Sequence, residues 1–211
     1  MLFSIGIPTL NRADLLVPSV KKYIKDFKDT EIHIIDNGNQ NLDYLEENVP
    51  IYVHNQVQNI GVAASWNKLC NLIFQKKDWA LLVNDDVYLG YGNQRVNMCI
   101  EMSENGIVQS EKSWSVLLIN KELYEYIGEF DEAFFPAYFE DSDYLYRLRL
   151  SGIRQDIMHH LNPEVFRISQ TYEKAPDLVN MAMSINKQRY IDKWGGLPYM
   201  ETFDSPFNNQ L

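Results

Sequence analysis

Trp79-Ala80-Leu81-Leu82-Val83-Asn84-Asp85-Asp86-Val87 is an apolar run of strand length that ends in two adjacent carboxylates. A buried carboxylate is costly unless it is paired or bound to a cation, so we expect this pair to face a cleft, a partner or a cation. In an extended backbone, Asp85 and Asp86 would point to opposite sides and meet different partners. The alternative is an ordinary turn after a strand, because Asp and Asn favour turns.

The composition limits the class of protein. The 211 residues, 45% of them hydrophobic, suit one large domain with a substantial core. The net charge of −10 argues against nucleic acid or an anionic membrane as the main partner. Cys70 and Cys99 are isolated, which is typical of reduced core residues in a cytosolic protein. No apolar run approaches the ~20 residues of a membrane span, and the N-terminus resembles a strand rather than a signal peptide, so we expect a cytoplasmic location.

Strands and helices are expected to alternate along the first half of the chain. The stretch quoted above is the last of four expected strands, and the others cover residues 2–7, 32–35 and 51–54. Apolar residues at helical spacing predict helices over 14–27 and 62–74. This alternation predicts an α/β sheet with largely parallel strands.

The second half is less regular. It is expected to contain helices over 93–104, 121–127, 144–150 and 177–193, strands over 114–119 and 153–159, and a loose polar tail from residue 201. Before the third of these helices, an aromatic-rich segment leads into three acids, Glu140, Asp141 and Asp143. The charged first turn of a helix would explain these acids, because the helix dipole favours them there. A role in chemistry is the alternative.

Polar residues follow three of the expected strands. They are Thr9, Asn11 and Arg12 after the first strand, Asp36 after the second, and Asn84, Asp85 and Asp86 after the fourth. In sheets of this kind, ligands bind outside the carboxyl ends of the strands. Three polar strand ends therefore favour a ligand site at this edge over turn chemistry alone.

Six segments of the chain, in order and spacing, resemble family 2 glycosyltransferases, which have the GT-A fold. The segments are residues 4–12 (SIGIPTLNR), 34–38 (IIDNG), 59–67 (NIGVAASWN), 84–86 (NDD), 128–141 (GEFDEAFFPAYFED) and 193–195 (KWG). The resemblance implies a single Rossmann-like domain over residues 1–211, with a mostly parallel central sheet flanked by helices and an acceptor-side subregion. It assigns residues 1–90 to the nucleotide sugar, 91–200 to the acceptor and 201–211 to a loose tail.

The resemblance also implies an activity. This activity is the inverting transfer of a hexose or deoxyhexose from a nucleotide-diphosphate sugar, with UDP as the expected nucleotide, to a hydroxyl of a glycan or glycoprotein acceptor. Mn²⁺ or Mg²⁺ is the implied cofactor, because a divalent cation neutralises the charge that develops on a diphosphate leaving group. The chain is further similar to glycosyltransferase domains of large chlorella viruses that act on capsid glycoproteins, which would place it in the host cytoplasm.

On the donor side, the resemblance gives the acidic motif separate roles. Asp86 is the implied metal ligand, and Asp85 is expected to touch the ribose or to bridge through water. Asn84 stands where the family commonly has an acid, so we expect it to hydrogen-bond the nucleotide instead of binding metal. His159 and His160 follow the later acids at a distance where some GT-A enzymes place a metal-binding histidine. On a strand only one of them would face the site; His160 is the preferred ligand, and a structural histidine is the alternative.

Six further residues are expected on the nucleotide sugar: Pro8, Thr9, Arg12, Asp36, Asn59 and Asn67. Arg12 could reach a phosphate or the base, or could be an ordinary surface cation. Asp36 is implied to accept a hydrogen bond from N3–H of the base, with turn formation as the alternative. Loop capping would equally explain Asn59, and helix packing would explain Asn67.

On the acceptor side, Asp141 is the implied general base that takes the proton from the acceptor hydroxyl. A carboxylate opposite the leaving group permits in-line displacement with inversion, and the preceding aromatics would raise its pKa toward a useful value. Glu140 is expected to orient the acceptor, and Asp143 is the alternative base. Trp114 and Tyr138 are the aromatics expected nearest to the acceptor, although most aromatic clusters are simply core.

Two other classes compete with this interpretation. A sugar-phosphate nucleotidyltransferase needs a glycine-rich loop after the first strand, where backbone N–H groups cradle a triphosphate. Here that loop is residues 8–13, which contain no glycine. A non-catalytic module of the same fold could hold a nucleotide or a glycan without turnover. The acids at both Asp86 and Asp141 favour an enzyme over such a module.

Overall fold

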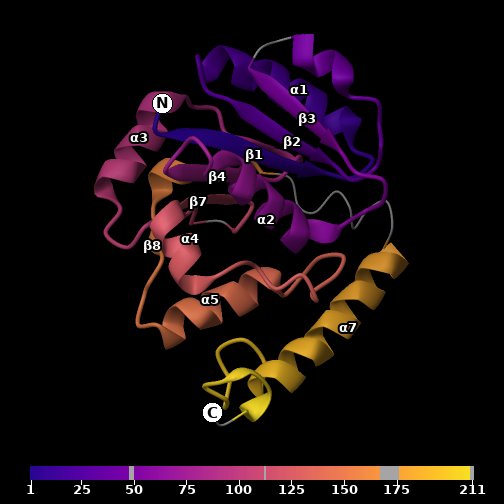
Figure 1. The fold of residues 1–211 in the computed structure, drawn as a ribbon, viewed down its shortest axis with the longest axis vertical. Coiled ribbons are helices and arrows are strands. Elements are labelled where there is room, and N and C mark those ends of the chain that lie inside the picture. The colour runs from indigo at the N-terminus through magenta and orange to yellow at the C-terminus, as the bar shows by residue number, and fades with distance from the viewer. Residues whose placement is uncertain (48–49, 112, 167–175, 210–211) are drawn as a thin grey trace.

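The centre of the molecule is a seven-stranded sheet in the order β3-β2-β1-β4-β7-β6-β8 (Figure 1). The computed structural model describes residues 1–47, 50–111, 113–166 and 176–209. The strands of the sheet are β1 (Phe3–Thr9), β2 (Ile32–Asp36), β3 (Ile51–Asn55), β4 (Trp79–Val83), β6 (Ile107–Gln109), β7 (Val116–Asn120) and β8 (Asp156–Ile157). β7 is antiparallel to both of its neighbours, and the other six strands run in one direction. The expectation of an α/β domain with a mostly parallel sheet is confirmed.

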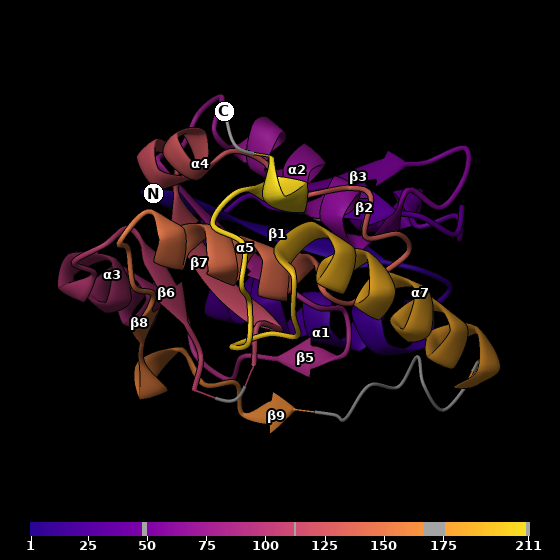
Figure 2. The ribbon, with the colours of Figure 1, turned by 90° about the horizontal axis from the view of Figure 1, so that it is seen from below.

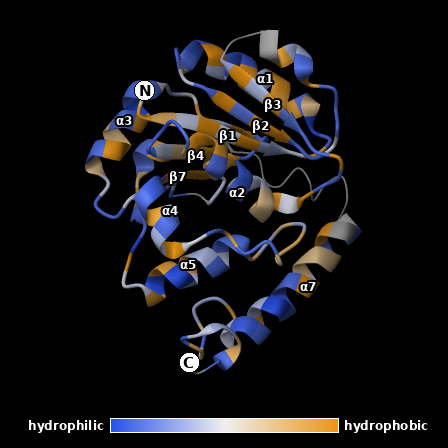
Figure 3. Cartoon of the chain, viewed as in Figure 1, coloured by the Kyte–Doolittle hydropathy of each residue, from blue (hydrophilic) through white to orange (hydrophobic). Residues whose placement is uncertain are grey.

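Helices cover both faces of the sheet, so its central strands are apolar on both sides. Every residue of β1 and β2 is buried. One face carries α1 (Ala13–Asp26), α3 (Asn93–Met102) and the two-stranded ribbon of β5 (Val87–Tyr88) and β9 (Val165–Phe166). The other face carries α2 (Gly61–Ile73), α4 (Lys121–Ile127) and α5 (Glu140–Leu150). Figure 3 shows the resulting pattern, with hydrophobic residues concentrated in the strands.

A last helix, α7 (Pro176–Trp194), lies outside these layers, beside α5 (Figures 1 and 2). It packs on α5 through an aromatic cluster of Phe134, Tyr146, Tyr190 and Trp194. The segment from residue 201, expected to be loose, instead docks on this pair of helices. The N–H groups of Thr202 and Phe203 donate to Trp194 O, and Tyr146 OH donates to Phe203 O. The expectation of a loose tail is therefore wrong for residues 201–203; a 3-10 turn, η3 (Pro206–Asn208), follows.

The helices and strands expected over residues 2–74 are present to within two residues at each end. Three later boundaries differ. The opening strand ends at Val83, α5 begins at Glu140 instead of residue 144, and of the strand expected over 153–159 only β8 forms, before the 3-10 turn η2 (His159–Leu161). β6 and β9 were not expected, because runs of two or three residues show no periodicity. A further short 3-10 turn, η1 (Asp43–Glu47), joins β2 to β3.

The two cysteines are free and buried, as expected. Cys70 packs on the α2 face of the sheet and Cys99 on the α3 face, so the sheet separates them. Across the residues described, none of the helices has the length and apolarity needed to cross a membrane.

Two neighbouring histidines, His33 on β2 and His54 on the edge strand β3, predict that the fold is sensitive to acid. His33 Nδ1 and His54 Nε2 lie 3.2 Å apart. Burial, together with the nearby His54, lowers the pKa of His33 to about 4. The unfolded chain keeps the ordinary value of about 6.5, so unfolding takes up a proton between these two values. The stability that neutral His33 contributes is therefore complete above about pH 6.5 and is lost as the pH falls toward 4.

We expect acidification from pH 7.5 to 5 to lower the free energy of unfolding by about 2 kcal/mol more in the wild type than in His33→Phe. The aromatic replacement keeps a ring against Tyr52, which stacks on His33 at 5.1 Å. Urea titrations at the two pH values measure the difference, with the exposed His159→Phe as the control. An equal loss of stability in all three proteins would show that His33 is not the acid-sensitive group.

Candidate active site

The site lies where the path of the chain through the sheet reverses. From β1 the chain moves outward to β2 and β3, and then returns to β4 on the other side of β1. The helices that follow β1 and precede β4 lie on opposite faces, so a crevice opens between the carboxyl ends of these two strands. Thr9 Oγ1 donates a hydrogen bond to Asp85 Oδ2 across this crevice, at 2.7 Å.

The acidic motif forms a tight turn. Val87 N–H donates to Asn84 O at 3.3 Å, which places Asp85 and Asp86 at the two central positions. The expectation that their side chains point to opposite sides is wrong, because the chain has left the strand at Val83. Both carboxylates instead line one cleft of about 110 Å³, together with Asp14, Lys22 and Tyr88 of the α1 face. The two sequence interpretations are thus both right, because the acids lie in a turn and also line a cleft.

Burial and charge oppose each other at Asp85. Burial raises the pKa of Asp85 to about 6, although the Thr9 hydrogen bond and the positive charge of Arg12 act against the rise. Arg12 is only 5% exposed, and its guanidinium donates to both carboxylate oxygens of Asp14, at 3.0 and 3.2 Å. The surface-cation alternative for Arg12 is therefore wrong. Its charge is held at the crevice.

The residues of this cleft fit a hard divalent cation. Asp85 and Asp86 offer carboxylate oxygens, which Mg²⁺ and Mn²⁺ prefer. Within the described ranges, no group of three or more His, Cys, Asp or Glu residues is placed to hold a metal. One or two protein carboxylates suit Mg²⁺ or Mn²⁺ when phosphate oxygens and waters complete the coordination. The donor set therefore fits a cation that binds together with a diphosphate.

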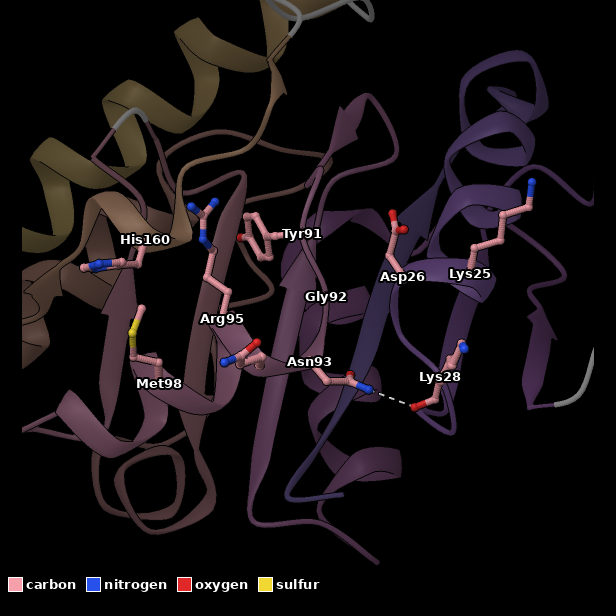
Figure 4. Close-up of a pocket in the computed structure, with 10 residues that line it drawn as sticks. Lys25, Asp26, Lys28, Tyr91, Gly92, Asn93, Arg95, Met98 and His160 are labelled. Atoms are coloured by element: carbon pink, nitrogen blue, oxygen red, sulfur yellow. Dashed lines mark hydrogen bonds between the residues drawn. The ribbon is translucent and has the colours of Figure 1, made fainter.

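His160 does not join this cleft. It lines a separate cavity of about 640 Å³ between the end of α1 and the start of α3, with Arg95 and Met98 beside it (Figure 4). His159 and His160 lie in the η2 turn with their ring centroids 3.7 Å apart, so the expected strand geometry, with one ring facing the site, is wrong. This placement does not support His160 as a ligand of the same metal as Asp86.

The acceptor-side acids begin α5. Glu140 is 6% exposed, and its Oε2 has no hydrogen-bond partner among the residues that the structure describes. Burial raises the pKa of Glu140 to about 8, and the charge of Asp141 adds to the rise. Burial also raises the pKa of Asp141, against hydrogen bonds from Ser142 N–H at 2.7 Å and Ser142 Oγ at 3.3 Å. The acids do form the first turn of a helix, as the alternative predicts. In this turn, however, the buried Glu140 Oε2 has no hydrogen-bond partner among the described residues.

The segment before β7 contacts both the Asn84–Asp86 turn and helix α5. Asn84 N–H donates to Ser115 O at 3.0 Å, just before β7. The neighbouring Trp114 ring meets the Tyr144 ring edge-on at 6.3 Å, and Tyr144 lies one helical turn beyond Glu140. Trp114 is half-buried and packs against the core on the α2 face of the sheet, so an acceptor contact through its ring stays a prediction. Tyr138 lies two residues before Glu140, with its backbone in the left-handed region at φ 76°.

Two of the expected site residues are structural. Asp143 is fully buried, and it accepts hydrogen bonds from Lys193 Nζ at 2.6 Å, Trp194 Nε1 at 2.8 Å and Arg147 Nε at 3.0 Å. Its role as an alternative base is therefore wrong. Asn67 Nδ2 donates to Phe130 O at 2.9 Å, and Asn67 Oδ1 accepts from Phe130 N–H at 2.8 Å. Helix packing, not nucleotide contact, explains Asn67.

Three further residues expected on the nucleotide, Asp36, Pro8 and Asn59, also have structural roles. Asp36 is fully buried and accepts hydrogen bonds from the N–H groups of Gly38 and Gln40, at 2.9 and 2.6 Å. The turn alternative is therefore right, and the carboxylate does not face a nucleotide base. Pro8 is buried in β1 opposite Ile35 and does not line the cleft. Asn59 Oδ1 accepts from Gly61 N–H at 2.9 Å, which is the expected loop cap. A nucleotide contact through the Asn59 amide nitrogen stays a prediction.

The sequence interpretation missed two buried asparagines. Asn37 Nδ2 donates to Ser65 Oγ, and its Oδ1 accepts from Ile60 N–H, which ties the loop after β2 to the start of α2. Asn186 of α7 is 1% exposed and binds the segment before Glu140. A signal was present for Asn186, because it is the one polar residue at helical spacing among Val179, Ala182, Tyr190 and Trp194.

Comparison with known proteins identifies the fold. No protein-family model matches the chain, and no curated protein sequence matches it. Among solved structures, the mannosyltransferase PcManGT from Pyrobaculum calidifontis, in complex with GDP-Man and Mn²⁺, matches with a TM-score of 0.69 and 12% identity over 94% of this chain. TarS from S. aureus matches with a TM-score of 0.56 and 13% identity over 91% of this chain.

This chain spans 66% of the PcManGT chain and 40% of the TarS chain. A third match, assigned as a glucose-1-phosphate thymidylyltransferase from Bacillus anthracis, has a TM-score of 0.51 and 12% identity over 74% of this chain and 87% of its own. Identities this low establish a shared fold. The chain is therefore a single α/β domain of the GT-A-like class, as expected.

We expect Asn67→Ala to lower the free energy of unfolding by about 3 kcal/mol, because the buried N–H and C=O of Phe130 and the OH of Tyr124 lose their partner. The matched control is Asn71→Ala on the same helix, whose exposed amide donates to Glu129 and whose loss should cost less than about 1 kcal/mol. Urea denaturation measures both. Weaker nucleotide binding in Asn67→Ala without a loss of stability would restore the nucleotide role.

Proposed function

We propose that this chain is a metal-dependent inverting glycosyltransferase that moves a hexose or deoxyhexose from a nucleotide-diphosphate sugar to a hydroxyl of a glycan or glycoprotein. One observation carries the proposal: Asp85 and Asp86 line one cleft at the crevice between β1 and β4, where Thr9 donates a hydrogen bond to Asp85. The similarity to PcManGT, whose complex holds GDP-Man and Mn²⁺, supports a nucleotide-sugar donor and a divalent cation.

On the donor side, Asp86 would hold Mn²⁺ or Mg²⁺, with Asp85 on the ribose or linked through water. When bound, the cation would neutralise charge on the departing diphosphate. Thr9 keeps Asp85 in place, and the buried Arg12 adds positive charge to the crevice. The side chain of Asn84 would hydrogen-bond the nucleotide, and its backbone N–H is bound to Ser115 O.

On the acceptor side, Asp141 takes the proton of the acceptor hydroxyl. The oxygen attacks the anomeric carbon as the bond to the diphosphate breaks, so the anomeric configuration inverts. Burial favours the neutral form of Glu140 up to about pH 8, and a neutral carboxyl can donate a hydrogen bond from Oε2. Glu140 would therefore orient the acceptor while Asp141 removes the proton. The rate should fall as the pH falls through the raised pKa of Asp141.

UDP is the nucleotide implied by the sequence resemblance, and family 2 membership and a viral origin are predictions from the same resemblance. A panel of UDP-, GDP- and dTDP-sugars, assayed for slow hydrolysis without acceptor, identifies the donor. Hydrolysis of a GDP-sugar alone would replace UDP in this proposal and leave the transferase class intact.

A second candidate is a sugar-phosphate nucleotidyltransferase, which the third structural match favours. The loop after β1 lacks the glycines that cradle a triphosphate, so we place this candidate second. Pyrophosphate release from a nucleoside triphosphate and a sugar 1-phosphate would establish it. A non-catalytic module would show neither reaction.

We expect Asp141→Asn to slow transfer by about 10²–10⁴-fold while nucleotide binding is unchanged, because the base is lost and the crevice is untouched. Glu140→Gln should cost less than about 10-fold, because an amide keeps a hydrogen-bond donor at that position. Initial rates and calorimetric binding of the nucleotide measure both, with the exposed Asp192→Asn as the control. A Glu140→Gln defect as deep as that of Asp141→Asn would move the base to Glu140.

Removal of divalent cations with a chelator should abolish transfer and weaken nucleotide-sugar binding, and added Mn²⁺ or Mg²⁺ should restore both. Asp86→Asn should require a higher cation concentration for half-maximal activity, because one charged oxygen ligand is lost. Titration of activity against Mn²⁺ measures this. Full activity in the chelated enzyme would remove Asp86 from metal binding.

A further inference from the structure

The backbone immediately before the catalytic acids adopts a costly conformation. Tyr138 and Phe139 both lie in the left-handed region, at φ 76° and 75°, and neither is a glycine. A left-handed backbone costs a residue with a side chain on the order of 1 kcal/mol or more, so it persists only where the surroundings impose it. These two residues set the direction in which α5 begins, and hence the orientation of Glu140 and Asp141.

The carbonyls of this segment are held from α7 and α2. Asn186 Nδ2 donates to Ala137 O at 2.8 Å and approaches the carbonyl oxygens of Phe135 and Tyr138 at 3.2 Å. Val62 N–H donates to Pro136 O at 2.8 Å. Four consecutive carbonyl groups are thus bound, and three of them share one side-chain amide.

The same helix holds the segment at a second point. Two helical turns after Asn186, Lys193 Nζ bridges Asp131 Oδ2 at 2.7 Å and Asp143 Oδ1 at 2.6 Å. Asp131 precedes the left-handed residues and Asp143 follows the acids. One face of α7 therefore fixes the start, the middle and the end of the segment that carries Glu140 and Asp141.

Simple packing does not explain why an amide stands at Asn186, whereas its hydrogen bonds to the carbonyls before Glu140 do. Asn186 is 1% exposed, and its Oδ1 has no hydrogen-bond partner in the part of the chain that the structure describes. A buried amide oxygen without a partner costs about 1–3 kcal/mol, so an apolar residue would serve simple packing better. Helical spacing places Asn186 between Ala182 and Tyr190, which are both buried.

We infer that Asn186 is a positioning residue, which fixes the left-handed turn at Tyr138 and Phe139 and so presents Glu140 and Asp141 to the acceptor hydroxyl. This inference rests on the proposed transferase function for its catalytic consequence. Because the hydrogen bonds of Asn186 to described residues all go to carbonyls of the segment before Glu140, we expect donor binding at the Asp85–Asp86 cleft not to depend on it.

The test compares Asn186→Ala with Asn180→Ala, the same substitution at an exposed position of the same helix. We expect Asn186→Ala to lower kcat by about 10–100-fold and to leave the KM for the donor within about twofold, because misorientation of a catalytic group affects the chemical step. The acid limb of kcat should also move to lower pH, because a loosened turn admits water to Asp141. Asn180→Ala should match the wild type in all three measurements.

A readout independent of activity separates this inference from the proposed function. Amide hydrogen exchange over residues 135–143 should be faster in Asn186→Ala than in Asn180→Ala, with exchange in β1 and β4 unchanged. If the wild type turns over no nucleotide sugar, the proposed function is wrong. The exchange measurement still tests whether Asn186 fixes the turn at Tyr138 and Phe139. Should Asn186→Ala not fold, Asn186→Ser is used, which retains a hydroxyl donor. Unchanged exchange, or an unchanged kcat with a normal pH profile, would overturn the inference.

Discussion

The hydrogen bond from Thr9 to Asp85 joins the two strands between which the chain reverses its path, 76 positions apart in sequence. A buried carboxylate needs compensation, and Asp85 receives it from this hydroxyl and from the charge of Arg12. The polar residues after β1 are thus required by the acids after β4, and neither group is stable at the crevice alone. The α1 face closes around them through Asp14, which pairs with Arg12 and lines the same cleft.

Two acids in the first turn of α5, Asp143 and Glu140, differ in their partners. Asp143 and Glu140 lie within one turn of α5, and both are buried. Asp143 is matched by Lys193, Arg147 and Trp194, so its charge stabilises the junction of α5 with α7. Glu140 faces no such cation among the described residues, and burial accordingly raises its pKa to about 8. A raised pKa, together with a buried oxygen that lacks a hydrogen-bond partner among the described residues, makes Glu140 a candidate site residue.

The sequence predicted most of the fold because the strands and helices of residues 2–74 are long enough to show their periodicity. It could not predict β6 or β9, whose pairing depends on distant chain segments. At the candidate site, the position of Asp85 and Asp86 after a strand predicted acids at the crevice, and the role of Asp141 as a base stays a prediction. The roles of Asp36 and Asn67 were misjudged, because the loop groups that satisfy them are defined only by the folded chain.

The position of α7 outside the sheet layers follows from where the acceptor-side acids lie. The sheet places Thr9 at the end of β1 and Asp85 in the turn directly after β4, but Glu140 and Asp141 follow an irregular segment. The sheet reaches this segment only through packing, for example of Phe130 against Tyr144 at 4.2 Å, and packing is weakly directional. Hydrogen bonds to carbonyl groups are directional, and Asn186 and Lys193 supply directional contacts from a single rigid helix. These directional contacts, which hold the segment around Glu140 and Asp141, therefore come from α7 and not from the sheet.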